Sequence, residues 1–217
     1  MELLTLFIDI ILNLDQHLIW LVQNYGNWIY LILFLIIFCE TGLVVTPFLP
    51  GDSLLFVAGA IAATGSMDVQ VLAALLMLAA FMGDNTNYWI GRYFGPRIFS
   101  RPESRLLNSA HLEKTQIFYA KHGGKTIIFA RFLPIVRTFA PFVAGVGRMV
   151  YPHFVAYSAF GSVFWISFFV FGGFFFGNVP VVKSNLSFFI FGIIVLSVLP
   201  GIIQFFRNWL GSRRSQT

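Results

Sequence analysis

Length, composition and charge exclude a soluble globular protein. The chain has 217 residues, of which 58% are hydrophobic and only 11% are charged, and 27 of them are phenylalanine. A soluble domain carries about 25% charged residues because water must solvate its surface. The formal charge of +5 could indicate nucleic-acid binding, but basic residues beside apolar segments are typical of the cytoplasmic face of a membrane protein. We therefore expect a membrane protein that binds no nucleic acid.

The first 24 residues predict an amphipathic helix that lies in the membrane interface. Polar side chains recur as a stripe from Glu2 to Gln23 in an otherwise apolar segment, as in helices that lie on a bilayer. A weakly marked first span is the alternative. The N-terminus has no basic region, so we expect no cleaved signal peptide.

Four segments predict helices that cross the bilayer, whose apolar core of about 30 Å needs about 20 helical residues. They are residues 28–46, 69–93, 154–177 and 184–206. The last two contain no charged residue, whereas Glu40 interrupts the first and Asp84 interrupts the second.

Residues 47–64 and 126–147 are apolar but predict re-entrant hairpins. Pro47 and Pro50 lie at the start of the first segment, and the second contains Pro134 and Pro141. Proline removes a backbone donor and interrupts a helix. Such backbone is tolerated in a membrane only inside protein or beside a wet cavity.

Basic residues predict which parts of the chain face the cytoplasm. Seven lysines and arginines lie in the stretch from Arg92 to Lys125, and the tail adds three arginines after residue 206. The positive-inside rule places both the loop 96–125 and the C-terminus in the cytoplasm. With this orientation, the two hairpins enter from opposite faces. We expect a short surface helix over residues 109–122 of the loop.

Three short motifs occur twice, in one order and at nearly one spacing. Phe48-Leu-Pro returns at Phe132, Ala58-Gly59 at Ala144, and Gly91-x-x-x-Gly95 at Gly173-x-x-x-Gly177. They predict an inverted repeat of units 28–95 and 126–177, an architecture of many secondary transporters. The Gly-x-x-x-Gly motifs predict close helix packing.

The predicted fold is therefore an all-α integral membrane protein, with transmembrane helices, two oppositely inserted re-entrant hairpins and interfacial helices. Residues 1–217 form a single membrane domain that ends in the span and basic tail at 184–217.

Arg131 and Arg137, in the second hairpin, predict a binding site for a phosphate group. A guanidinium group stays charged and offers a planar fork of donors that matches phosphate oxygens. An ionised group in the bilayer costs at least about 2.5–3.5 kcal/mol, which indicates a function. The alternative is that both arginines only pair with Glu40, Asp52 or Asp84 and hold the hairpins together.

Glu40 and Asp52 are the candidates for proton coupling. Removal from water favours the protonated form of a carboxyl group. A phosphate that binds an arginine would displace the carboxylate paired with that arginine, and the displaced acid would then bind a proton. For Asp52, which follows Pro50-Gly51, a turn role is the alternative. Asp84 and Asn87 predict a supporting hydrogen-bond cluster between helices.

The sequence predicts no metal, no cofactor and no enzyme activity. Its four histidines lack ligand spacing, its single cysteine cannot form an intrachain disulfide, and we find no phosphate-binding glycine loop or nucleophile–base pair. A lipid phosphatase is the enzymatic alternative.

Three long motifs resemble the signatures of the DedA family, also called the SNARE-associated or VTT domain family. They run from Glu40 to Gly59, from Gly83 to Arg92 and from Ala130 to Gly145. The resemblance implies a bacterial inner-membrane protein linked to envelope integrity and the proton motive force. Several members are implicated in returning undecaprenyl phosphate to the cytoplasmic leaflet. The acids and arginines that family members need match Glu40, Asp52, Arg131 and Arg137 here.

We therefore predict a proton-coupled flippase for a phosphorylated lipid carrier such as undecaprenyl phosphate. The alternatives are a phospholipid translocase or scramblase and a proton-coupled cation or drug exchanger. The expected partners are an anionic lipid (a polyprenyl phosphate or a phospholipid), protons and the membrane, and a homo-oligomer is also considered.

Overall fold

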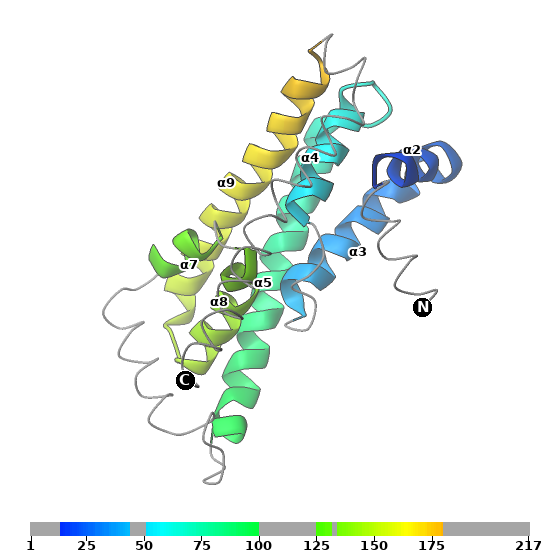
Figure 1. Ribbon diagram of the computed structural model, residues 1–217. Coiled ribbons are helices and arrows are strands. Elements are labelled where there is room, and N and C mark those ends of the chain that lie inside the picture. The colour runs from blue at the N-terminus through cyan, green and yellow to red at the C-terminus, as the bar shows by residue number, and fades with distance from the viewer. Residues whose placement is uncertain (1–13, 44–50, 100–124, 132–133, 180–217) are drawn as a thin grey trace, which may run out of the picture. The chain divides into compact units, whose positions relative to one another are not determined.

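A computed structural model of the protein describes residues 14–43, 51–99, 125–131 and 134–179. Every regular element in these ranges is an α-helix (Figure 1), which confirms the all-α class. The helices are α2 (Leu14–Tyr25), α3 (Trp28–Gly42), α4 (Gly51–Ala62), α5 (Val69–Phe99), α7 (Lys125–Ala130), α8 (Pro134–Val146) and α9 (Tyr151–Gly177). The helices predicted for residues 109–122 and 184–206 lie outside the described residues, as do residues 1–13 of the interfacial helix.

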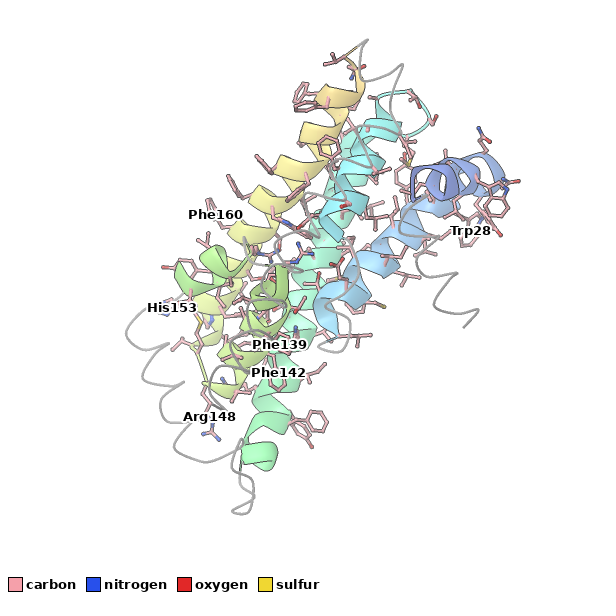
Figure 2. The ribbon with its side chains drawn as sticks, viewed as in Figure 1. Trp28, Phe139, Phe142, Arg148, His153 and Phe160 are labelled. Carbon is pink, nitrogen blue, oxygen red and sulfur yellow. The ribbon has the colours of Figure 1, made fainter. Side chains whose placement is uncertain are left out.

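Helices α5 and α9 are long and apolar enough to cross a membrane, and α3, α4 and α8 are shorter apolar helices. Large apolar side chains are exposed along α9: Phe160, which points outward in Figure 2, is 59% exposed and Phe175 is 68% exposed. Polar side chains such as Asp84 and Ser158 are buried instead. Exposed apolar and buried ionisable side chains are consistent with a membrane protein.

The helix ends follow local chemistry. The Asp68 carboxylate accepts hydrogen bonds from the backbone N–H groups of Gln70 (2.8 Å) and Val71 (3.0 Å), and so caps the N-terminus of α5. Gly26, with a φ of +50°, follows the end of α2, where a left-handed residue commonly stops a helix.

The predicted interruption in residues 126–147 is confirmed, because α7 ends at Ala130 and α8 begins at Pro134. A proline at the first position of a helix loses no hydrogen bond. Pro141, which we expected to interrupt the segment as well, lies inside α8. An internal proline costs one backbone hydrogen bond, but α8 continues through Pro141 to Val146.

The described helices belong to two compact units. The first unit contains α2, the start of α3, α4, the start of α5 up to Leu72, and α9 from Phe168 onward. The second unit contains the remainder of α3 and α5, together with α7, α8 and α9 up to Ser167.

In the first unit, α4 packs against the C-terminal part of α9 through glycines. A Cβ atom at Gly59 would lie 2.1 Å from the carbonyl oxygen of Val170, and a Cβ at Gly173 would lie 2.0 Å from that of Phe56. No side-chain atom fits at such a distance, so the two backbones are in direct contact. Close approach of this kind is the reason for small residues at membrane helix interfaces.

In the second unit, α8 packs against α5 in the same way. A Cβ at Gly145 would lie 2.0 Å from the carbonyl oxygen of Tyr88, and a Cβ at Gly91 would lie 2.1 Å from that of Phe142. The prediction that the Gly-x-x-x-Gly motifs are packing faces is confirmed.

The two helix pairs use corresponding members of the repeated motifs. Gly59 and Gly145 come from the two Ala-Gly motifs, and Gly91 and Gly173 begin the two Gly-x-x-x-Gly motifs. The partners are exchanged between repeats: α4 of the first predicted repeat unit contacts α9 of the second, and α8 of the second contacts α5 of the first. Each compact unit therefore contains helices from both predicted repeat units.

Candidate functional site

Arg131 is the centre of a buried polar cluster in the second unit. Its side chain, just after α7, is 8% exposed and forms an ion pair with Asp84 of α5, which is 3% exposed. The same Nη2 donates to Ser162 Oγ at 2.8 Å and to the Ser158 carbonyl oxygen at 3.5 Å, both on α9. The Ser158 hydroxyl donates to the paired Asp84 oxygen at 2.6 Å. The guanidinium group therefore connects α7 with α5 and α9.

Arg137 forms a second ion pair in the same unit. Its Nη2 on α8 lies 2.7 Å from Oε1 of Glu40 on α3, and the two side chains are 10% and 3% exposed. Breaking a buried ion pair leaves an uncompensated charge and is strongly destabilising. The pair therefore fixes the short helix α8 against α3.

Asn87 of α5 links the backbones beside this second ion pair. Its fully buried amide nitrogen donates to the carbonyl oxygens of Thr41 at 2.9 Å and Thr138 at 2.7 Å. Thr41 directly follows Glu40, and Thr138 directly follows Arg137. One amide group thus holds α3 and α8 in the register that brings the acid and the arginine together.

Trp165 of α9 lies beside both arginines. The centroid of its ring is 4.6 Å from Cζ of Arg137 and 5.8 Å from Cζ of Arg131, within the range of cation–π attraction. The indole is 6% exposed. The two guanidinium groups therefore lie around one buried aromatic ring.

The predicted site residues fall into two groups. The second unit brings together Glu40 with Arg137, and Asp84 with Arg131, so the pairing with acids considered as an alternative is present. Asp52 belongs to the first unit, where it is half-buried in the first turn of α4.

Sequence reasoning missed Ser158, Ser162 and Trp165. All three lie in a span without charged residues, where neither charge nor proline attracts attention. Their i, i+4, i+7 spacing places them on one helical face. Two hydroxyl residues and a tryptophan on a single face of a phenylalanine-rich span are the signal that could have identified them.

The cluster contains two guanidinium groups and two carboxylates, so its formal charges cancel. An incoming anion could exchange with a carboxylate for the same N–H donors, provided that the displaced acid is neutralised by a proton. Among the described residues, no group of three or more histidine, cysteine and acidic side chains is placed to hold a metal ion.

Comparison with known proteins identifies the family. The VTT domain matches residues 49–175. Over 217 residues, the chain is 55% identical to the Escherichia coli (strain K12) Protein DedA, with 99% of each chain covered. The protein belongs to the DedA family. This DedA family member is also 33% identical over 154 residues to the E. coli inner membrane protein YqjA, with 70% of each chain covered.

The same family member is 31% identical over 157 residues to the E. coli inner membrane protein YghB, with 72% of each chain covered. None of these three names assigns a substrate or a reaction. No solved structure matches the chain.

Proposed function

We propose that this DedA family member is a proton-coupled flippase that returns a phosphorylated lipid carrier, undecaprenyl phosphate, to the cytoplasmic leaflet of the bacterial inner membrane. Its phosphate is bound by Arg131 and Arg137, while the prenyl chain stays in the lipid. The observation that carries this proposal is the pair of buried guanidinium groups around one indole, each held by its own carboxylate.

The donor geometry supports a phosphate ligand. Guanidinium groups recognise phosphate oxygens through paired N–H donors. In the described part of the chain, the buried Nε of Arg131 has no hydrogen-bond partner. A phosphate oxygen would satisfy this donor, since buried polar groups are costly unless hydrogen-bonded.

Proton coupling follows from the exchange of anions. When the phosphate binds Arg137, the buried Glu40 loses its counter-ion. A buried carboxyl group without a counter-ion has a much lower free energy in its neutral form than in its charged form. Glu40 therefore takes up a proton as the lipid binds. Asp52 is the second acid proposed for this coupling, with Asp84 and Asn87 in supporting roles.

The proposed topology gives the site access to both leaflets. Two re-entrant hairpins enter from opposite faces as an inverted repeat, with the C-terminus in the cytoplasm. The equivalent glycine contacts of α4 with α9 and of α8 with α5 support the repeat. In transporters with inverted repeats, one bundle of helices moves against another around a fixed site.

The proposal is tested in liposomes that contain the purified protein and undecaprenyl phosphate. The measurement is the fraction of lipid phosphate that an added water-soluble phosphatase can reach. With an acidic exterior, wild type should deplete the outer leaflet faster than protein-free liposomes, and Arg137→Gln should not. Arg148→Asn is the matched control, because Arg148 is exposed in the turn between α8 and α9 (Figure 2) and has a positive φ that asparagine tolerates. Wild type that accelerates no polyprenyl phosphate would exclude this function.

The same liposomes distinguish the two alternatives. Equal acceleration of ordinary phospholipids would indicate a phospholipid translocase or scramblase. A cation or drug exchanger needs the carboxylates but no arginine fork, so it would carry protons in exchange for cations in vesicles without polyprenyl phosphate. A pH-sensitive dye inside the vesicles measures that flux.

A further inference from the structure

We propose that Trp165 is a positioning residue that keeps both guanidinium groups in place while their carboxylates are displaced by the anionic ligand. This inference rests on the proposed phosphate-binding function and adds a residue to it. No charge, motif or resemblance in the sequence singled out Trp165.

In the second unit, Trp165 lies on a different kind of element from the two arginines. The two arginines come from different short elements, Arg131 after α7 and Arg137 on α8, whereas Trp165 lies within the long helix α9. Its ring is the feature that both cations share, at 4.6 Å and 5.8 Å from the ring centroid. Because a long continuous helix holds the Trp165 ring in place, the ring can position side chains that come from two short segments.

Trp165 and the carboxylates contact the arginines in different ways. Glu40 and Asp84 bind the arginines through N–H donors, and these are the donors that a phosphate group needs. An aromatic face attracts a cation through its quadrupole and uses no N–H donor. Trp165 can therefore hold the guanidinium groups both before and after the anions exchange, which a carboxylate cannot do.

The indole ring also acts electrostatically on the two cations. Two like charges around one buried ring repel each other whenever one carboxylate leaves, since the low dielectric of a buried site strengthens Coulomb forces. The negative face of the indole offsets this repulsion without neutralising either cation. Trp165 thus keeps the positive charge available to the ligand.

The chain contains an internal control. The centroid of the Trp89 ring lies 5.9 Å from Cζ of Arg92, also within cation–π range. Trp89 is 50% exposed, and its ring contacts in the described residues are with Tyr88, Tyr151 and Arg92. A ring modification that acts through general cation–π strength or protein stability would affect both tryptophans. A modification that acts through the arginine pair would affect only Trp165.

The decisive experiment replaces Trp165 with tryptophans that carry an increasing number of fluorine atoms, which weaken the ring quadrupole with little change in ring shape. The affinity for undecaprenyl phosphate is measured in nanodiscs. We expect the dissociation constant to rise with each fluorine, by roughly tenfold over the series, in protein that stays folded at the temperature of the assay. The same series at Trp89 should leave the affinity unchanged. A constant affinity across the Trp165 series, in protein that binds the lipid, would overturn the inference and leave the proposed function standing.

A second measurement needs no lipid. The side-chain N–H resonances of Arg131 and Arg137 should carry a ring-current shift in wild type that Trp165→Leu removes and Trp165→Phe partly keeps. Shifts that survive in Trp165→Leu would refute the positioning role. If wild type shows the shifts but neither binds nor moves undecaprenyl phosphate, the proposed function fails and the positioning of the arginines remains.

Discussion

Gly161 of α9 lies directly against the side chain of Arg131: a Cβ atom at this glycine would be 2.7 Å from Nε and 2.9 Å from Cδ of the arginine. The glycine thus provides the space in which the guanidinium group reaches Asp84 and Ser162. Because Nε and Cδ are in the middle of a buried side chain that is held at its end, the arginine cannot move aside without losing those partners.

Gly161→Ala should therefore displace Arg131 and abolish lipid transport, with a loss of about 1–3 kcal/mol in stability, as for other overpacked sites. Gly172→Ala on the same helix is the control, because its Cβ would meet only a Phe56 ring atom at 3.9 Å, an ordinary contact. The transport assay and the thermal midpoint measure the two effects. Equal activity in both variants would contradict this account of Gly161.

Asp84→Asn should destabilise the protein by about 3–5 kcal/mol, the usual cost of leaving one member of a buried ion pair uncompensated. Thermal unfolding in detergent measures the loss. The double variant Asp84→Leu with Arg131→Met removes both charges, so its stability should recover while its transport stays absent. If the double variant transported lipid, Arg131 would have no part in binding it.

Asn87→Leu should separate Glu40 from Arg137 without changing either residue. It removes both donors and leaves the half-buried carbonyl group of Thr41 and the buried one of Thr138 without this bond, at a cost of about 1–3 kcal/mol. We expect transport to fall at least tenfold. Thr86→Val is the control, since the Thr86 hydroxyl donates to the Met82 carbonyl oxygen of its own helix and, within the described residues, joins no other helix. An Asn87→Leu variant as active as Thr86→Val would exclude the register role.

Gly59→Ala and Gly145→Ala should have similar effects, because the two glycines make equivalent contacts in the two units. Each new methyl group would overlap a backbone carbonyl, of Val170 and of Tyr88 respectively. Backbone cannot move as a side-chain end does, so we expect a loss of about 3 kcal/mol in each case, the upper part of the overpacking range. A large loss in one variant and none in the other, measured by thermal unfolding, would argue against the equivalence.

Arg131→Lys and Arg137→Lys should each abolish transport although the charge is kept. An ammonium group is a point charge and cannot reproduce the planar fork of donors that a phosphate needs. The thermal midpoints show whether either variant still pairs with its acid. A folded lysine variant with wild-type transport rates would contradict the phosphate clamp.

The sequence alone determined the properties that depend on neighbouring residues. The position of α9 follows from a continuous apolar stretch, and the break between α7 and α8 follows from Pro134, whereas α5 continues to Phe99, beyond the apolar segment 69–93. Hydropathy and the missing proline donor act over one or two helical turns, so they can be recognised without any tertiary contact.

The choice of partners was decided only by the tertiary structure. The sequence offered three acids for two arginines, and the structure pairs Arg131 with Asp84 and Arg137 with Glu40. It also placed Trp165 beside both arginines and exchanged the helices of the two repeats in packing. Coulomb attraction and close packing act between residues far apart in the chain, so helix register and glycine contacts, rather than residue type, select each partner.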